Sequence, residues 1–391
     1  MRILIVHTYY KMHGGEDAVV QNETELLQSD GHEVELMDFR NASSTLSKVL
    51  FMAFNPNVYF RVIKKIKFFK PDVVHIHNLH YAGTAAILYA ARRMKVPIVM
   101  TIHNYRLLCP SGSLYFDNQL FLKSLEESFS WSAVKRGVYQ QSKAITFWLA
   151  LTNYLHRQIG TWGLVDSMIF LGDHSKKIFE QSGLLNVNTK TFLKPNFTNQ
   201  KKFVSANDKG NYYLFIGRLS EEKGIKTLLK AFENHSEVLK IAGTGPLRDF
   251  VLETEERSAN IEYLGQLSKT EIGKMIDGAK ALIFPSEWYE TFGMVIIESF
   301  SLGKPVIAAD LGNIPSIVKD QINGITFLPG NAQELRKKLF EFDNLDNQAK
   351  QNLANGALMS YEKYYTSEVN LKRLIHIYSD TLTNKKAVRN R

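Results

Sequence analysis

The chain has 391 residues, one cysteine (Cys109) and a formal net charge of +9. Its length is too great for one ordinary hydrophobic core and favours two domains of about 150–200 residues each. The single cysteine excludes an internal disulfide and a cysteine-based metal cluster, and no apolar run approaches the roughly 18 residues that span a bilayer. Because residues 1–6 are typical of a strand and not of a signal peptide, we expect a cytoplasmic protein, soluble or bound to the inner membrane face.

The positive charge is concentrated in the first half of the chain. Residues 1–195 contain 22 Lys and Arg against 15 Asp and Glu, a net charge of +7, whereas the remainder has 26 against 24, a net charge of +2. Such a bias favours an anionic partner such as a membrane or a polyanionic substrate, and an ordinary solvated surface explains it equally well. No recognised nucleic-acid-binding motif appears, so we do not expect nucleic acid as a partner.

The chain opens with an apolar strand at 2–6, a loop that contains Gly14 and Gly15, and a helix over 18–27. Glycines let backbone amides face a ligand, and the following helix N-terminus adds a partial positive charge. This loop could therefore hold a diphosphate, although a plain turn would have the same sequence.

Basic and apolar residues alternate in the segment 60–70. Such a segment can lie on an anionic membrane with its apolar side chains among the headgroups. The spacing of Val62, Ile63, Ile66 and Phe69 is that of a stripe facing a core, so we favour packing. A second aromatic and basic region, 120–162, suits a membrane interface or a lipid-linked acceptor as well as it suits helices that cover a sheet.

Three histidines, His75, His77 and His80, follow one another on or just after a strand at 72–77. We do not expect them to bind a metal, because no carboxylate or cysteine nearby completes a ligand set. His103 ends the next strand, 97–103, and this is the position at which active-site residues of open α/β sheets lie.

Polar residues at 196–211 predict the interdomain linker. The second half then begins with a strand at 212–216, a loop at 217–224 and a helix from 225. The loop contains two cations, Arg218 and Lys223, which would stabilise negative charge that develops on a leaving phosphate. A solvated charged loop is the alternative.

The most informative stretch is 281–308, which predicts two buried parallel strands, 281–284 and 305–308, joined by a helix over 292–302. Two carboxylates, Glu290 and Glu298, bracket the first two turns of that helix, and Gly293 allows a ligand to approach its N-terminus. Both can contact one ligand only if it is long, as a nucleotide diphosphate sugar is; otherwise they are solvated.

This stretch, with Pro285, Ser286 and the Glu290/Glu298 pair, resembles the donor-binding motif of retaining glycosyltransferases with the GT-B fold, family 4 in particular. Residues 102–110 are similar to a loop of bacterial glycosyltransferases that build capsules and exopolysaccharides, and 217–224 match the family's pattern of glycines and cations. The chain departs from that pattern at Asn313 and Ser316, where the family has a glycine and a glutamate.

The resemblance implies a role for each candidate residue. His103 would lie beside the donor sugar, Arg218 and Lys223 would hold the diphosphate, and Glu290 and Glu298 would contact the sugar and the ribose. We therefore predict His103, Arg218, Lys223 and Glu290 as catalytic residues. The predicted donor-binding residues are Gly14, Gly15, Gly217, Gly243, Gly265, Phe292, Gly293, Met294 and Glu298.

The fold predicted from this alternation and from the resemblance is α/β: two doubly wound Rossmann-like domains face a cleft, and the C-terminal helix crosses back to the first. Residues 1–195 would bind the acceptor and 196–391 the donor. The predicted activity is retaining, metal-independent sugar transfer, without a cofactor, from a nucleotide diphosphate sugar (a UDP-sugar is favoured) to a lipid-linked oligosaccharide. A sugar-nucleotide epimerase and a non-catalytic nucleotide-sugar binder are the alternatives.

Overall fold

The structure is a computed structural model that describes residues 1–9, 14–40, 51–199, 211–233 and 235–389, with backbone only for 385–389. The chain forms two compact units. Unit 1 comprises residues 1–114, 121–196 and 370–391, and unit 2 comprises 115–120 and 197–369. Most of the linker predicted at 196–211 lies outside the described residues.

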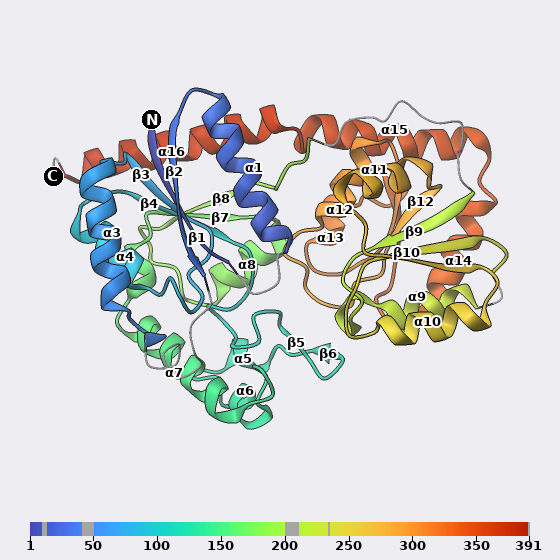
Figure 1. Ribbon diagram of the computed structural model, residues 1–391, viewed down its shortest axis with the longest axis horizontal. Coiled ribbons are helices and arrows are strands. Elements are labelled where there is room, and N and C mark those ends of the chain that lie inside the picture. Colours follow the sequence, from blue (N-terminus) through green and yellow to red (C-terminus); the bar gives the residue numbers. More distant parts are fainter. Residues whose placement is uncertain (10–13, 41–50, 200–210, 234, 390–391) are drawn as a thin grey trace. The chain divides into compact units, whose positions relative to one another are not determined.

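Unit 1 contains a parallel sheet with the strand order β2-β1-β3-β4-β7-β8 (Figure 1). Its inner strands are short apolar runs whose residues are almost all buried, as expected for a sheet covered on both faces. The strands are β1 (Arg2–Tyr9), β2 (Glu33–Arg40), β3 (Val73–Ile76), β4 (Ile98–Ile102), β7 (Ser167–Phe170) and β8 (Lys190–Leu193). The longer helices are α1 (Gly15–Ser29), α3 (Pro56–Phe69), α4 (Ala86–Arg93), α7 (Lys143–Gln158) and α8 (Asp173–Gln181).

The C-terminal helix α16 (Ser367–Arg389) contributes to the core of unit 1. Leu374, Ile377 and Tyr378 are buried in one cluster with residues of β1, β3 and β4. The Thr381 hydroxyl lies 2.7 Å from that of Ser167. The prediction that a terminal helix returns to the first domain is confirmed.

Unit 2 contains a second parallel sheet, with the order β11-β10-β9-β12-β13-β14. The two predicted Rossmann-like sheets are thus confirmed. The strands are β9 (Tyr212–Ile216), β10 (Val238–Ala242), β11 (Ile261–Gly265), β12 (Ala281–Phe284), β13 (Val306–Ala309) and β14 (Gly324–Phe327). The helices are α9 (Ile225–Phe232), α10 (Arg248–Arg257), α11 (Lys269–Gly278), α12 (Met294–Ser301), α13 (Ile314–Ile317), α14 (Ala332–Asp343) and α15 (Asn347–Tyr364), and a hairpin of β5 (Tyr115–Phe116) and β6 (Gln119–Leu120) belongs to this unit.

Each sheet has one point at which the strand order reverses, because the chain adds strands to one side of this point first and to the other side afterwards. It lies between β1 and β3 in unit 1 and between β9 and β12 in unit 2. Loops that leave the carboxyl ends of two such strands separate from one another and form a crevice in which ligands of open α/β sheets bind. The loops after these four strands are therefore where a functional site is expected.

Helix α3 packs as its apolar spacing predicted. Val62, Ile66 and Phe69 are buried and Ile63 is partly buried. Two phenylalanines on the same helix, Phe60 and Phe68, are 66% and 81% exposed. Packing thus accounts for one face of the helix and leaves the aromatic residues of the other face in solvent.

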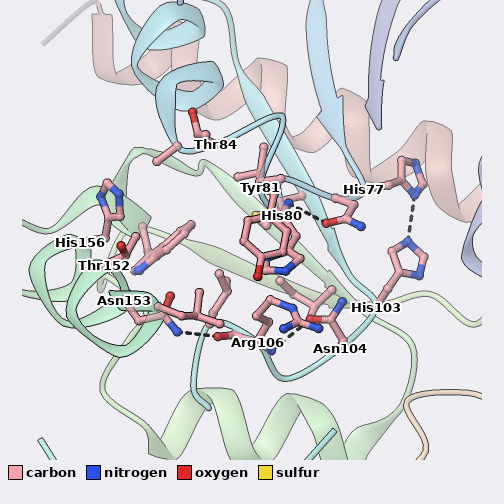
Figure 2. Close-up of a pocket in the computed structure, with 18 of the residues that line it drawn as sticks. His77, His80, Tyr81, Thr84, His103, Asn104, Arg106, Thr152, Asn153 and His156 are labelled. Atoms are coloured by element: carbon pink, nitrogen blue, oxygen red, sulfur yellow. Dashed lines mark hydrogen bonds between the residues drawn. The ribbon is translucent and has the colours of Figure 1, made fainter. Parts of the chain in front are cut away.

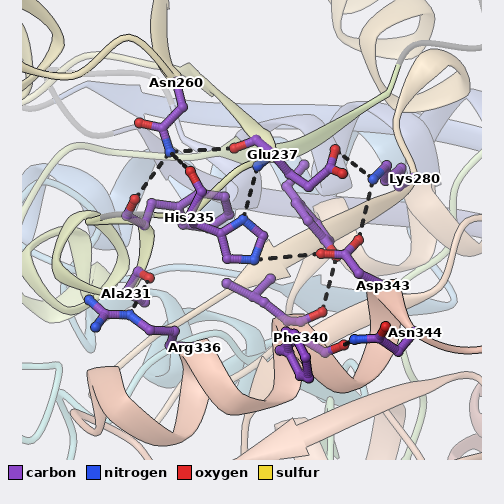
Figure 3. A network of polar contacts seen from close by, with 12 residues as sticks. Ala231, His235, Glu237, Asn260, Lys280, Arg336, Phe340, Asp343 and Asn344 are labelled. Atoms are coloured by element: carbon purple, nitrogen blue, oxygen red, sulfur yellow. Dashed lines mark hydrogen bonds and ion pairs between the residues drawn. The ribbon is translucent and has the colours of Figure 1, made fainter.

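A polar network lies at the amino-terminal edge of the unit 2 sheet, on the other side of the sheet from the loops that follow the carboxyl ends of its strands (Figure 3). Glu237 and Lys280 immediately precede β10 and β12, and their side chains form an ion pair of 2.7 Å. Asp343, at the end of α14, accepts a hydrogen bond of 2.8 Å from the hydroxyl of Tyr213 in β9 and pairs with Lys280. The network ties three strands to a helix and lies far from the loops at the carboxyl edge, so we assign it a structural role.

Candidate functional site

In unit 2, the loops after β9 and β12 bring together two predicted catalytic residues. Lys223 Nζ lies 2.5 Å from Glu290 Oε1, and the Ser286 hydroxyl donates to the same oxygen at 2.8 Å. Glu290 is only 4% exposed. The Lys223 ammonium also lies 5.2 Å from the ring centroid of Trp288. The site thus holds a buried carboxylate and a preorganised cation in direct contact.

The glycine after Lys223 allows this contact. Gly224 has a φ of +70°, and a Cβ on it would lie 2.0 Å from the carbonyl oxygen of Pro285. Only glycine lets the backbone of the first loop approach the second so closely. The lysine and glycine are therefore adjacent in sequence for a physical reason: one supplies the cation and the other the close approach.

Arg218 extends into solvent from the start of the same loop, and within the described residues no hydrogen bond or ion pair of its guanidinium is found. The predicted glycines around it hold three loops together. Gly217 N–H donates to the Ala242 carbonyl at 3.1 Å, and Gly243 N–H donates to the Gly265 carbonyl at 2.8 Å. A Cβ on Gly243 would lie 1.8 Å from the Gly217 oxygen. Close loop packing therefore explains Gly217 and Gly243, whether or not they also line a nucleotide site.

Helix α12 begins later than the sequence predicted. Its first residue is Met294 rather than Phe292, because Gly293 has non-helical backbone angles and caps the helix without a side chain. Glu290 consequently lies in the preceding loop, and the two carboxylates do not bracket the first two turns as predicted. Glu298 lies within the helix, partly buried, and burial raises the pKa of its carboxyl.

Asn313, one of the two departures from the family pattern, has a contact that the sequence did not reveal. Its side chain is fully buried, and its amide donates a 2.9 Å hydrogen bond to the carbonyl of Thr291. Thr291 follows Glu290, so Asn313 braces the loop that carries this predicted catalytic carboxylate. A glycine at this position could not make the bond.

In unit 1, His103 follows β4 and contacts His77, which follows β3. The His103 Nε2 and His77 Nδ1 atoms are 3.0 Å apart, and the two rings stack with centroids separated by 5.2 Å. Burial lowers the pKa of His103 to about 3, against the opposing charge of Glu23. His103 is therefore a neutral imidazole at physiological pH.

Glu23, from α1, lies beside these histidines and was missed by the sequence analysis. Its Oε2 is 3.5 Å from His77 Nε2, and its Oε1 forms an ion pair with Lys194; both of these charged side chains are fully buried. No sequence signal could have found Glu23, because it stands in an ordinary amphipathic helix 54 positions before His77. Its role is visible only once α1 is packed on the sheet.

The expectation that no carboxylate lies near the histidines is wrong. Glu23, His75 and His77 place possible metal ligands within 4.8 Å of one another, and His80 is not part of this set. However, the Lys194 ammonium already neutralises Glu23. Both ring nitrogens of His75 are also hydrogen bonded, to Tyr378 at 2.7 Å and Thr101 at 2.8 Å. A metal would have to break these contacts, so the residues fit a buried polar network better than a metal centre.

The glycine loop of unit 1 is held by the first turn of α1. Asp17 accepts hydrogen bonds from His7 Nε2 at 2.8 Å and from the Gly14 amide at 3.0 Å. The Gly14 N–H is therefore already occupied, and Gly15 is the stronger candidate of the pair for contact with a ligand. Asp17 is a second residue that the sequence analysis missed.

Glu16 lies between Gly15 and Asp17, and the pKa of its carboxyl is far above the ordinary value. Burial, reinforced by the charge of Asp17, raises the pKa of its carboxyl from 4.5 to about 8. Because the folded-state value lies above the unfolded value, ionisation of Glu16 opposes folding. The penalty is absent below pH 4.5, grows as the pH rises and is complete above about pH 8.

We therefore expect Glu16→Gln to raise the melting temperature more at pH 8.5 than at pH 5. The change can be measured by thermal denaturation at both pH values. The control is Glu25→Gln, which alters an exposed glutamate of the same helix and should leave the pH dependence unchanged. An equal shift of the Glu16 variant at both pH values would contradict the assignment.

A narrow pocket of about 80 Å³ lies next to His103 in unit 1 (Figure 2). Apolar side chains such as Met100, Leu149 and Trp162 line it, and Arg106 is the only charged residue among the described lining residues. The Asn153 amide donates to the Arg106 carbonyl at 2.7 Å. Asn153 and Leu149 come from α7, so the aromatic and basic region both covers the sheet and shapes this pocket.

Two family models match the chain. Residues 13–166 match Glycosyltransferase Family 4, and residues 196–357 match Glycosyl transferases group 1. An uncharacterised glycosyltransferase of Methanocaldococcus jannaschii is 26% identical over 275 residues, which cover 68% of this chain and 64% of that protein. An uncharacterised protein from the cps region of Klebsiella pneumoniae is 23% identical over 396 residues, with 89% and 98% covered.

Solved structures show the same fold. Sucrose-phosphate synthase from Thermosynechococcus elongatus aligns with a TM-score of 0.71 at 15% identity, covering 97% of this chain and 99% of that one. HepE from Anabaena, solved in complex with UDP, aligns with a TM-score of 0.70 at 18% identity and covers 97% and 100%. These likenesses show the GT-B fold. The two family models together span most of the chain and place it among the glycosyltransferases, with a family 4 domain followed by a group 1 domain.

In the part of the chain that the structure describes, none of the helices is both long and apolar enough to cross a bilayer.

Proposed function

We propose that this glycosyltransferase transfers a sugar, with retention and without a metal ion, from a nucleotide diphosphate sugar to a lipid-linked oligosaccharide in bacterial surface polysaccharide synthesis. The observation that carries the proposal is the contact of Lys223 with the buried Glu290 at the point in unit 2 where the strand order reverses. The similarity to a protein from the cps region of Klebsiella pneumoniae supports the assignment to surface polysaccharide synthesis. HepE, a structural neighbour, has been solved with UDP-glucose, which supports a UDP-sugar as the first donor to test.

The chemistry follows from the charges of the site. As the bond from sugar to phosphate breaks, negative charge grows on the leaving diphosphate, and Arg218 and Lys223 stabilise it more than they stabilise the bound donor. The backbone amides at Gly293 and Met294, where α12 begins, add a partial positive charge. Glu290 orients the sugar hydroxyls, and Glu298 binds the ribose. The leaving phosphate takes the proton of the acceptor hydroxyl, so that attack occurs from the same face.

Unit 1 supplies the acceptor side. Transfer requires it to present the acceptor hydroxyl and His103 to the donor sugar. Among the described residues that line the pocket beside His103, Arg106 is the one cation, and polar and apolar side chains are mixed, which suits an acceptor that carries both sugar and phosphate groups. The proposed mechanism uses no side chain as a covalent nucleophile, so no glycosyl-enzyme intermediate forms.

The first experiment is a thermal-shift screen of UDP-, GDP- and ADP-sugars. A ligand that binds only the folded state raises the melting temperature. We expect one nucleotide class to do so, and expect Glu298→Ala and Arg218→Ala to abolish the shift. Arg248→Ala, which removes an exposed arginine of α10, is the matched control. If millimolar UDP-, GDP- and ADP-sugars all leave the melting temperature of the wild type unchanged, the donor assignment is wrong.

Product analysis then separates the alternatives. A glycosyltransferase consumes the donor only when an acceptor is present, apart from slow hydrolysis, whereas an epimerase converts the donor alone. A non-catalytic binder shows the thermal shift and leaves the donor unchanged under both conditions.

We also propose that unit 1 binds an anionic membrane through the exposed face of α3. Phe60 and Phe68 are exposed, and Arg61, Lys64 and Lys67 lie near them on the same helix. Apolar side chains buried among headgroups and cations beside lipid phosphates each favour binding.

The double variant Phe60→Ser and Phe68→Ser should reduce co-sedimentation with anionic vesicles on the order of tenfold. Phe340→Ser, which replaces a 68% exposed phenylalanine of unit 2, is the control. Equal binding of the wild type to anionic and neutral vesicles, or no binding to either, would refute the proposal.

A further inference from the structure

The function proposed above uses only the inner side of helix α7. On that side, Leu149 and Asn153 line the pocket beside His103, and Asn153 can be followed in Figure 2. The opposite side of the helix is in solvent. There Leu155 and Ile159, the residue that follows the last turn, are 46% and 65% exposed. The proposed chemistry does not explain why this side is apolar.

Aromatic side chains extend the exposed surface onto the preceding helix, α6 (Trp131–Arg136). Trp131 is 54% exposed, and its ring centroid lies 6.1 Å from that of Phe147 in α7, which is 36% exposed. Phe129 contacts both rings, with centroid separations of 4.6 Å and 5.9 Å. A contiguous apolar surface of this kind marks an interaction site in a protein that is otherwise well packed.

The charges around this surface favour an anionic partner. Residues 131–160 contain four cations (Lys135, Arg136, Lys143 and Arg157) and no Asp or Glu. Apolar and aromatic side chains flanked by cations are typical of helices that lie in the interface of an anionic bilayer. Helix α7 has 16 residues, fewer than the roughly 20 that span the hydrocarbon core, so it suits a position in the plane of the interface.

The surface continues towards α3, the helix for which membrane binding is proposed above. His156 Nε2 of α7 donates a 2.9 Å hydrogen bond to the Ala53 carbonyl. The next residue, Phe54, is 40% exposed, and its ring lies 5.8 Å from that of Tyr59. The Tyr59 ring lies 5.4 Å from that of Phe60 in α3. Aromatic contacts thus connect the two helices, which are close enough to rest on one bilayer.

We propose that the outer side of α7, with Trp131 of α6, lies among the headgroups of an anionic bilayer and places the pocket beside His103 next to the membrane. A helix with its side chains is about 10 Å across, so only this thickness separates the headgroups from the pocket that α7 lines. An acceptor whose lipid part stays in the bilayer can then reach the pocket with its sugar end. As regards the acceptor, this inference rests on the proposed function, whereas the contact of α7 with lipid is independent of it.

Tryptophan fluorescence can locate the contact. The chain has four tryptophans: Trp131 and Trp148 are exposed on α6 and α7, Trp162 is buried, and Trp288 belongs to unit 2. We expect phosphatidylglycerol vesicles with brominated acyl chains to quench the fluorescence of the full chain. Trp131→Phe should remove a large part of this quenching, because it keeps an aromatic ring at the surface and removes the signal. Vesicle binding without quenching in the wild type would overturn the proposal.

The double variant Trp131→Ser and Ile159→Ser measures the contribution to binding. Both side chains are more than half exposed, so we expect a nearly unchanged melting temperature. Co-sedimentation with phosphatidylglycerol vesicles should weaken on the order of tenfold, because two apolar side chains no longer leave water. The control is Met359→Ser, which replaces a 68% exposed methionine of unit 2. Equal binding by the double variant and the wild type would contradict the proposal.

Two further results separate the alternatives. If the wild type sediments as a dimer and the double variant as a monomer, the surface binds a second copy of the chain and the proposal is wrong. If quenching and vesicle binding behave as expected but UDP-, GDP- and ADP-sugars leave the melting temperature unchanged, the membrane contact is supported and the proposed function fails instead.

Discussion

Replacing Lys223 with alanine is expected to lower kcat for sugar transfer by about 10²–10³-fold, the cost of removing one preorganised electrostatic group from a transition state. Lys223 is held in the site by Glu290 at 2.5 Å and by the ring of Trp288, so it needs no rearrangement to meet a developing negative charge. The effect should appear mainly in kcat, because the charge on the leaving diphosphate increases between the bound donor and the transition state. Initial rates with a radiolabelled donor measure it.

Lys226→Ala is the matched control for this experiment. Lys226 lies three positions further on, in α9, where it pairs with Glu221 on the surface at 2.6 Å. Its loss changes the net charge by the same amount and should leave kcat within about twofold. If kcat fell by a comparable factor in both variants, the loss would be a general effect of charge, and the assignment of Lys223 to the reaction would be wrong. Melting temperatures of both variants exclude unfolding as the cause.

The sequence allowed the fold to be predicted because the signals for it are local. Buried parallel strands appear as short apolar runs such as 98–102 and 281–284, and the helices between them follow from their spacing. The contact of Lys223 with Glu290 joins residues 67 positions apart, and only the resemblance to a known family placed them in one site. The start of α12 was predicted two residues too early, because the apolar pattern continues through Gly293 while the backbone does not.

The network behind His103 could not have been predicted. Glu23 stands in an amphipathic helix, Lys194 precedes a proline, and Asn370 lies in a helix near the C-terminus. None of these positions carries a motif, and each side chain would be solvated on an isolated element. These side chains contact one another only because α1 and α16 pack on the sheet of unit 1, and no local sequence pattern predicts that packing.

This network gives the largest expected effect on stability. Replacing Lys194 with alanine should reduce the free energy of unfolding of unit 1 by about 3–5 kcal/mol, because it leaves the carboxylate of Glu23 buried without a counter-charge. Lys194 and Glu23 are both 0% exposed, so water cannot replace the lost partner. Urea denaturation followed by circular dichroism measures the change, with each unit treated as a separate transition.

A second lysine of unit 1 provides the comparison. Lys190 pairs with Asp380 of α16 at 2.7 Å, but its side chain is 42% exposed, so Lys190→Ala should cost no more than about 1 kcal/mol. The double variant Lys194→Met and Glu23→Gln removes both buried charges together and should recover most of the stability lost by Lys194→Ala. If the double variant were as unstable as the single one, packing rather than charge would explain the loss.

The pH dependence provides a further check on the same pair. Burial alone would raise the pKa of Glu23, but the charge and the hydrogen bond of Lys194, together with contributions from His75 and His103, outweigh burial and lower the pKa below the ordinary value of 4.5. The stability that the pair contributes is therefore fully present above pH 4.5 and is lost as the pH falls through the folded-state pKa. In the double variant this acid-dependent loss should disappear. The same two substitutions thus test the contribution of the buried pair to folding by two independent measurements.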